Sequence, residues 1–352
     1  MVDKLNYIIL YTLFAFGVSL IFYPVYIRFL KHMKANKTLR IDATSGGKAE
    51  IFNKLHAHKA GTPTMGWGMF LLITLLLVWV SYALQQTGLI SNTLVARQET
   101  YILLFAFFGM GIRWLIDDWL NIKGRGKDRW LSARVKLIGM IALAAWVSYW
   151  FYVKIGIDYM QLWPLFNTNI HLGILYPIVT FFLTIAIVNA INITDGLDGL
   201  AWGMMVIVLS VMAVITFAYS WYLATALLGI IIGVLIAFLM FNISPAKIFM
   251  WDSWALALGG LVAALVYLLN LRDNFFIPFM VLFALFWLEL CSSALQIFWK
   301  KVFKKKLFSI APFHHFLEHK GMQEHTIVMK FWILQGVLAA ITLILVFYQL
   351  HQ

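Results

Sequence analysis

The chain has 352 residues, of which 62% are hydrophobic and only 12% are charged. A soluble protein carries roughly a quarter charged residues, so this composition excludes a soluble protein and predicts a polytopic membrane protein. The formal net charge is +12, but the basic residues are spread over several loops, so no nucleic-acid partner is expected. The single cysteine, Cys291, excludes a disulfide within the chain.

Ten apolar runs are long enough to cross a bilayer, and each should be helical because lipid offers the backbone no hydrogen-bond partner. They cover roughly residues 7–29, 66–84, 100–116, 137–153, 174–190, 203–219, 221–240, 255–270, 275–297 and 328–348. The predicted fold class is therefore all-α, a polytopic membrane protein of about ten transmembrane helices. No repeat or soluble domain interrupts this pattern, so residues 1–352 are predicted to form a single transmembrane domain.

The basic residues predict the orientation of these helices. Of the 27 Lys and Arg residues, 23 lie within residues 28–64, 113–136, 241–254 and 298–330, which follow odd-numbered spans. By the positive-inside rule these loops are cytoplasmic, and both termini are extracytoplasmic. A basic cytoplasmic face would attract anionic lipid and phosphorylated substrates.

Four polar islands interrupt the apolar sequence, at residues 116–118, 189–198, 249–252 and 311–315. The predicted topology puts all four on the cytoplasmic side. Five of the 15 acidic residues lie in three of these islands. Acids beside a bilayer are costly unless they pair or bind a cation. We therefore predict a cytoplasmic active-site cleft with a metal-assisted site.

The carboxylates of the first and third islands suit a metal ion. Asp117 and Asp118 are adjacent, and like charges this close repel unless a cation lies between them. Mg²⁺ prefers such oxygen ligands. The alternative is a solvated helix end for the pair. Asp252 stands in an apolar border, which favours metal binding or catalysis, although a helix N-cap fits its position equally well.

The second island carries polar side chains every three residues: Asn189, Asn192, Asp195 and Asp198. Neighbours at this spacing share a helix face, although Gly196 and Gly199 are expected to break the helix near its end. Amides and carboxylates there could hold a base or ribose by directed hydrogen bonds. Helix capping is the alternative.

The fourth island contains His314 and His315. No cysteine is nearby and the spacing matches no zinc motif, so contact with phosphate is the favoured interpretation. Upstream, Glu289, Ser292 and Gln296 form one polar stripe within a span. This stripe is expected to face the protein interior, with hydrogen bonding between helices as the simplest role.

Together the motifs resemble those of the bacterial phospho-N-acetylmuramoyl-pentapeptide transferase family, within the polyprenyl-phosphate N-acetylhexosamine-1-phosphate transferase superfamily. The matching stretches are residues 59–66, 116–118, 131–136, 189–201, 241–250 and 311–315. The Ala-Pro-x-His-His form at residues 311–315, with Lys320-Gly321 downstream, favours this family over N-acetylglucosamine-phosphate enzymes.

The resemblance implies phosphoryl transfer from UDP-N-acetylmuramoyl-pentapeptide to undecaprenyl phosphate, giving lipid I and UMP, with Mg²⁺ as cofactor. It implies a multi-pass protein of the bacterial cytoplasmic (inner) membrane whose partners are these two substrates and membrane lipid, with a homodimer left open. A transferase for another UDP-N-acetylhexosamine is the nearest alternative. An ion-coupled transporter is a third, which the absence of repeats disfavours.

Site residues also follow from the resemblance. The implied catalytic residues are Asp117, Asp118, Asp252, His314 and His315. The implied metal ligands are Asp252, Asp117, Asn192 and Asp195. The implied substrate-binding residues are Lys59, Thr64, Lys136, Asn189, Asn192, Asp195, Asp198, Asn242 and Phe249. Asp117 is the implied base for the lipid phosphate, although a nucleophilic role stays open. Lys59, Asp198 and Phe249 resemble a uridine pocket.

The chain departs from the family pattern at five positions: Trp251, Trp254, Ala255, Phe316 and Asn121. In the family these positions usually hold a Gly, a Gly-Ser pair, a third His and a Lys. Because wide aromatic faces can stack on a base or occlude it, we expect Trp251, Trp254 and Phe316 to tune donor binding without removing catalysis.

Overall fold

The computed structural model describes residues 2–33, 59, 61–88, 93–94, 100–108, 133–162, 169–250, 253–272 and 275–351. Over these residues, eight helices are long and apolar enough to cross a membrane, or nine if one bent pair forms a single span. The chain is therefore an all-α polytopic membrane protein, as predicted from its composition. The exact number of spans and the sidedness of the termini stay predictions.

The long helices lie where the apolar runs predict them. Their bounds are α1 (Val2–His32), α3 (Trp67–Gln86), α5 (Ala133–Tyr149) with the π-helical turn η2 (Trp150–Lys154), α6 (Leu175–Thr194), α7 (Leu200–Ala218), α8 (Tyr222–Asn242), α9 (Ser253–Arg272), α10 (Phe276–Leu282), α11 (Ala284–Phe303), α12 (Phe313–His319) and α13 (Glu324–Leu350). Residues 100–108 are also helical, and the rest of the third predicted span lies outside the described residues.

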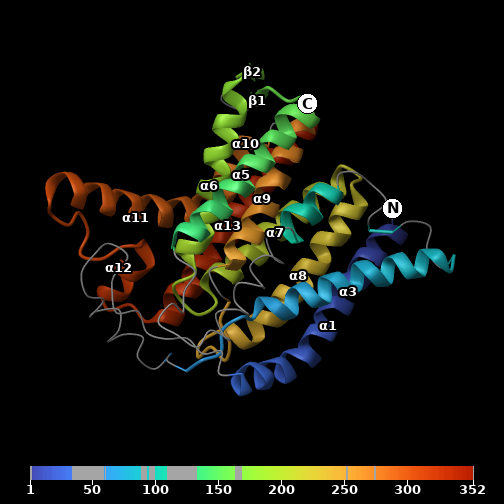
Figure 1. The fold of residues 1–352 in the computed structure, drawn as a ribbon, viewed down its shortest axis with the longest axis horizontal. Helices are drawn as coiled ribbons and strands as arrows, with labels where there is room; N and C mark the ends of the chain where they lie inside the picture. Colours follow the sequence, from blue (N-terminus) through green and yellow to red (C-terminus); the bar gives the residue numbers. More distant parts are fainter. Residues whose placement is uncertain are drawn as a thin grey trace.

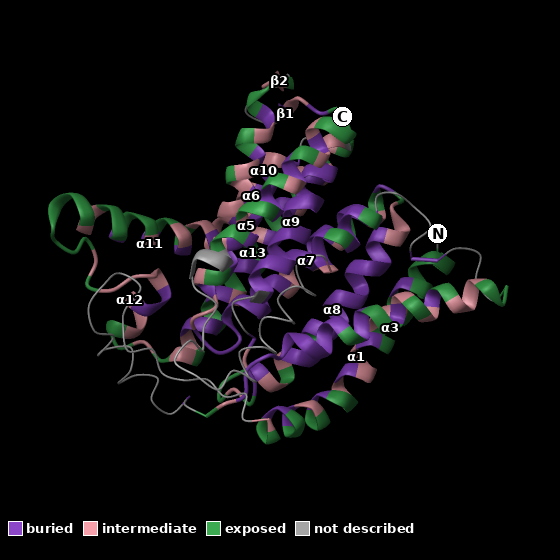
Figure 2. Ribbon diagram, viewed as in Figure 1, coloured by how far each residue is buried: buried purple, intermediate pink, exposed green. Residues whose placement is uncertain are grey.

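The most buried helices are α7, α8 and α9, which Figure 2 shows largely in purple at the centre of the molecule. Helix α8 packs closely on α1 through two glycines. A Cβ atom at Gly229 would overlap the hydroxyl of Thr12, and one at Gly233 would overlap the Thr12 carbonyl oxygen. Small residues at this spacing let membrane helices approach closely. The central helices are thus fixed by packing.

The ninth predicted span, over residues 275–297, is not one continuous helix. Helices α10 and α11 meet at Phe283 with a bend of 73°, and α11 runs sideways from the main bundle (Figure 1). The Leu282 carbonyl at this break accepts a hydrogen bond of 2.7 Å from Gln335 Nε2 on α13. A broken membrane helix persists where neighbouring groups satisfy the freed backbone. The prediction of a single uninterrupted span is therefore corrected.

A small hairpin is the second feature that the sequence did not predict. Strand β1 (Tyr159–Gln161) pairs antiparallel with β2 (Asn169–His171), with Met160 opposite Ile170. Strands of three residues are too short to show an alternating apolar pattern. The hairpin lies beside the C-terminus, at the opposite end of the molecule from α12 (Figure 1). That end is the predicted extracytoplasmic side.

Candidate active site

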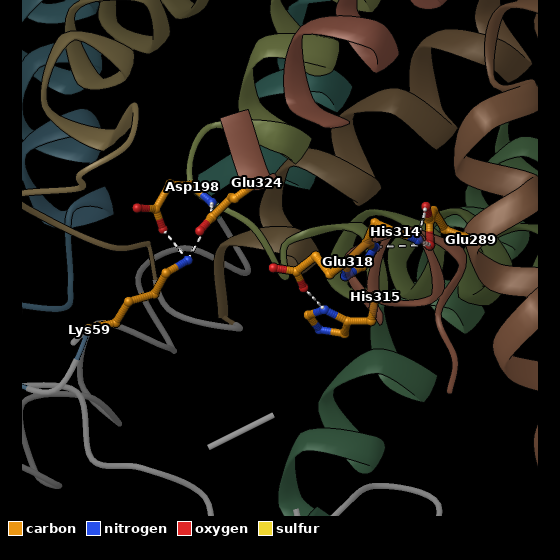
Figure 3. Close-up of polar contacts among 7 residues, drawn as sticks. All are labelled: Lys59, Asp198, Glu289, His314, His315, Glu318 and Glu324. Carbon is orange, nitrogen blue, oxygen red and sulfur yellow. Dashed lines mark hydrogen bonds and ion pairs between the residues drawn. The ribbon is translucent and has the colours of Figure 1, made fainter. Parts of the chain in front are cut away.

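Three segments far apart in the sequence meet in a buried ion cluster (Figure 3). Lys59 Nζ lies 2.7 Å from Asp198 Oδ1 and 2.6 Å from Glu324 Oε1. The Asp198 backbone N–H donates to the same Glu324 oxygen over 2.6 Å. The side chains of Lys59, Asp198 and Glu324 are only 5%, 2% and 14% exposed. We call these three residues the lysine cluster.

The turn that carries Asp198 is shaped by the end of one helix and the start of the next. Helix α6 ends at Thr194, and Gly199 begins α7 from the left-handed conformation with φ of 77°. That conformation is readily available only to glycine. Gly199 is the N-cap of α7 and no side chain caps it, so capping does not explain Asp198. Asp198 instead uses its carboxylate for tertiary contacts.

Further hydrogen bonds tie this turn to the loop that follows α8. Asp198 Oδ2 accepts from the Ala246 N–H over 3.0 Å. Asn242 Oδ1 accepts from the Gly199 N–H over 3.1 Å, while its Nδ2 donates to the Ile248 carbonyl over 2.8 Å. Asn242 is itself buried. The predicted substrate-binding residues Lys59, Asp198 and Asn242 are therefore brought together.

Thr64 and Phe249 are brought together by backbone pairing. The Phe249 N–H donates to the Pro63 carbonyl over 2.8 Å, and the Gly66 N–H donates to the Phe249 carbonyl over 3.0 Å. Thr64 lies between these partners and is buried, while Phe249 is half-buried. The segment at residues 61–66 is thus fixed beside the loop that also contacts Asp198.

The two histidines lie on α12 and pair with different carboxylates (Figure 3). Glu289 and His314 are both fully buried. The Glu289 carboxylate accepts from the His314 backbone N–H over 3.1 Å, and its Oε2 lies 3.0 Å from His314 Nδ1. His315 Nδ1 lies 2.6 Å from Glu318 Oε2. We call Glu289 and His314 the histidine pair.

The histidine pair supports the turn between α6 and α7. A Cβ atom at Gly196 would overlap His314 Nε2, so the imidazole packs directly against this glycine. A carboxylate can only accept hydrogen bonds, so an ionised Glu289 requires the proton of His314 on Nδ1. The second and fourth islands therefore meet, as the predicted topology requires.

The polar stripe on α11 faces inward, as predicted. Ser292 Oγ accepts from the Phe313 N–H over 3.1 Å, and Gln296 Oε1 accepts from the Phe308 N–H over 2.8 Å. Glu289, Ser292 and Gln296 are all buried. Their partners are backbone groups of the segment leading into α12, so the stripe holds this segment rather than another membrane span.

Several predicted site residues are placed less fully. On α6, Asn189 Nδ2 donates to the Ile185 carbonyl over 2.8 Å, Asn192 is exposed, and Asp195 is half-buried directly after the helix. Three predicted acids, Asp117, Asp118 and Asp252, lie outside the described residues together with Asn121 and Trp251, and so does the side chain of Lys136. Where side chains are described, no group of three His, Cys, Asp or Glu is placed to hold a metal ion.

Two of the family departures have different surroundings. Trp254 is 1% exposed and packs against Phe70 at a ring-centroid distance of 4.4 Å, with Trp67 and Phe107 also adjacent. This burial argues against the expectation that Trp254 stacks on a bound base. Phe316 is half-buried on α12, where Lys320 Nζ lies 5.6 Å from its ring centroid.

Glu324 is the site residue that sequence reasoning missed. It lies in the first turn of α13. An acid there is ordinarily explained by the helix dipole. The available signal was its rarity, since it is one of only 15 acids and falls in a predicted cytoplasmic loop. Its pairing with Lys59 spans 265 positions, which no local pattern can reveal.

The fold and this polar end define a membrane-embedded transferase. The family model described as Glycosyl transferase family 4 matches residues 100–270. Three similar proteins, all named phospho-N-acetylmuramoyl-pentapeptide-transferase, come from Geobacillus sp., Clostridium acetobutylicum and Thermoanaerobacter sp.. They are 32%, 32% and 33% identical over 92%, 95% and 98% of this chain, and over 93%, 98% and 99% of their own lengths. The chain belongs to the phospho-N-acetylmuramoyl-pentapeptide transferase family.

Proposed function

We propose that this protein transfers phospho-N-acetylmuramoyl-pentapeptide from its UDP donor to undecaprenyl phosphate, giving lipid I and UMP in the bacterial cytoplasmic membrane. The observation that carries this proposal is the similarity to relatives of this one name over nearly the whole length of both chains. The convergence of residues 59–66, 189–199 and 242–250 supports it, since these stretches form one polar site at the end of a helix bundle.

The chemistry explains why such a site lies at the end of the transmembrane helices. The donor is a water-soluble nucleotide, whereas the acceptor carries a phosphate on a long hydrocarbon tail. The reacting groups therefore meet where the bilayer ends. Phosphoryl transfer needs little covalent chemistry from the protein, so positioning and charge neutralisation carry most of the catalysis. In our proposal Asp117 removes the proton from the lipid phosphate, with Asp118 beside it.

A divalent cation would offset the negative charge of the donor diphosphate and the acceptor phosphate. The residues that would hold Mg²⁺ are Asp252, Asp117, Asn192 and Asp195, all of which offer the oxygen ligands that this ion prefers. The described members fit this role, because Asn192 is exposed and Asp195 half-buried at the open end of α6. Neutral amide and carboxylate oxygens there can bind a cation without a buried charge having to move.

The proposal is tested by measuring UMP release from purified protein in lipid vesicles. We expect release only when UDP-N-acetylmuramoyl-pentapeptide, undecaprenyl phosphate and Mg²⁺ are all present, with loss on chelation. UDP-N-acetylglucosamine serves as the matched alternative donor. Faster release from that sugar would identify a transferase for another N-acetylhexosamine and contradict the proposal.

Asp252→Asn tests the metal role within the same assay. Loss of one charged oxygen ligand should lower turnover by more than about a hundredfold, the order seen when a principal electrostatic group is removed. Asp158→Asn, in the loop before β1, is the matched control, because Asp158 pairs only with an exposed histidine at the opposite end of the protein. Near-normal turnover of Asp252→Asn would refute its assignment as a ligand.

A further inference from the structure

Glu324 occupies a central position in the lysine cluster. Its Oε1 atom accepts from two donors on different segments, Lys59 Nζ and the Asp198 backbone N–H, each at 2.6 Å. Charge-assisted hydrogen bonds this short are the strong ones. Because Glu324 begins α13, it joins the segment at residue 59 and the turn at residue 198 to the last membrane helix. Removing its charge would loosen both connections together.

The charge balance of the lysine cluster bears on what it can bind. The cluster contains two carboxylates, of Asp198 and Glu324, and one ammonium group, of Lys59. The ammonium lies within 2.7 Å of both carboxylates, so its charge is already compensated inside the protein. A phosphate brought to this cluster would meet an excess of negative charge. The lysine cluster therefore suits an uncharged hydrogen-bonding group better than an anion.

The two proposed substrates differ in such groups. Undecaprenyl phosphate offers one phosphate and a hydrocarbon tail, whereas the UDP donor also offers a neutral base with carbonyl and N–H groups. The loop beside the cluster adds the half-buried ring of Phe249, fixed through its own backbone N–H and carbonyl. An aromatic face next to neutral polar groups suits a planar base. The lysine cluster therefore faces the nucleoside part of the donor.

From these observations we infer that Glu324 is a positioning residue for the nucleotide donor. It holds Lys59 and the Asp198 turn in one geometry and compensates the lysine charge, so that the cluster presents hydrogen-bonding groups to the base rather than to the phosphates. This inference rests on the proposed transferase function. It assigns to α13 a part in donor recognition, acting through Lys59 and Asp198 rather than by contact with the reacting atoms.

Steady-state kinetics of the full-length protein test this role. Glu324→Gln keeps the size of the side chain but removes its charge, and Glu324→Asp keeps the charge on a shorter side chain. His325→Gln, at the exposed neighbouring position, is the matched control. We expect Glu324→Gln to raise the KM for the UDP donor about tenfold to a hundredfold, as for loss of a buried charge-assisted hydrogen bond. The inhibition constant of UMP should rise in parallel.

Other kinetic constants separate positioning from general damage. The kcat at saturating donor and the KM for undecaprenyl phosphate should stay within about threefold of the unaltered protein, because only donor binding is weakened. Glu324→Asp should recover part of the donor affinity. Adding Lys59→Met to Glu324→Gln should raise the donor KM by less than Lys59→Met does alone, since the two residues act as a unit.

The outcomes distinguish this inference from the proposed function. If the unaltered protein releases no UMP, both are overturned. If it is active but Glu324→Gln leaves the donor KM unchanged, or raises both substrate constants equally, or lowers only kcat, the inference alone fails. Thermal unfolding accompanies each assay. If neither Glu324 variant folds, Glu324 is a structural residue and the inference is likewise overturned.

Discussion

The lysine cluster and the histidine pair are two buried polar assemblies on either side of the same turn, and they are built differently. In the first, Lys59 and Glu324 come from segments 265 positions apart and are joined through charge. In the second, Glu289 binds both the backbone and the ring of one residue, and the ring then packs against Gly196. The comparison shows that similar carboxylates can either join segments and compensate a charge or orient a neighbouring side chain.

The two assemblies are expected to control different steps. Asp198 is anchored by Lys59, Glu324 and Ala246, so its position depends little on the histidine pair. Asp195 lies directly beside Gly196, on the side of the turn that His314 supports. Since Asp195 is a predicted ligand of the metal region, changes at the histidine pair should lower turnover. Changes at the lysine cluster should weaken donor binding.

The largest effect is expected for Glu289→Ala. This change leaves the His314 N–H and Nδ1 without their buried acceptor, and unsatisfied buried donors cost about 1–3 kcal/mol each. Turnover should fall about a hundredfold, with a lower unfolding temperature and a donor KM close to normal. The measurements are UMP release and thermal unfolding. Glu289→Gln, which retains one acceptor oxygen, should be milder, and equal loss in both variants would contradict the role of the acceptor.

A smaller effect is expected for Gly196→Ala. The added Cβ would overlap the imidazole of His314, so either the ring or the turn must move. We expect a roughly tenfold fall in turnover, in line with the cost of overpacking a buried site. Gly336→Ala on α13 is the control, since a Cβ there meets nothing within 4 Å. If the two alanine variants had the same activity, His314 would not support the turn.

The smallest effect is expected for Gln335→Leu, which removes the hydrogen bond to the Leu282 carbonyl at the bend between α10 and α11. The lost bond should lower the free energy of unfolding by about 1 kcal/mol. Because α11 carries Glu289, turnover should fall slightly, by at most about threefold, while donor KM should not change. A rise in donor KM measured in the UMP-release assay would show that the two assemblies are not independent.

Much of this architecture could be predicted from the sequence because its causes are local or compositional. Apolar length predicts the spans, and the basic loops indicate that separate islands share one face. Gly196 and Gly199 mark the end of a helix, and the spacing of Glu289, Ser292 and Gln296 predicts an inward stripe. Each of these features is confirmed over the described residues.

The remainder depends on partners that lie far away in the chain. Glu324 could not be assigned because its role follows from Lys59 and Asp198, both more than a hundred positions away. The bend at Phe283 has no proline at the break and depends on Gln335 of another helix. Trp254 differs from the family pattern beside a predicted ligand, yet it fills an aromatic core with Phe70 and Phe107. Such features are decided by packing.

The separation of the two assemblies is tested most directly by equilibrium binding of the UDP donor without the lipid acceptor. The dissociation constant would be measured for the unaltered protein, Glu324→Gln and Glu289→Gln in the same vesicles. We predict an increase of about tenfold or more for Glu324→Gln and less than about threefold for Glu289→Gln. Equal increases in both variants, or a larger one for Glu289→Gln, would contradict the assignment of donor binding to the lysine cluster.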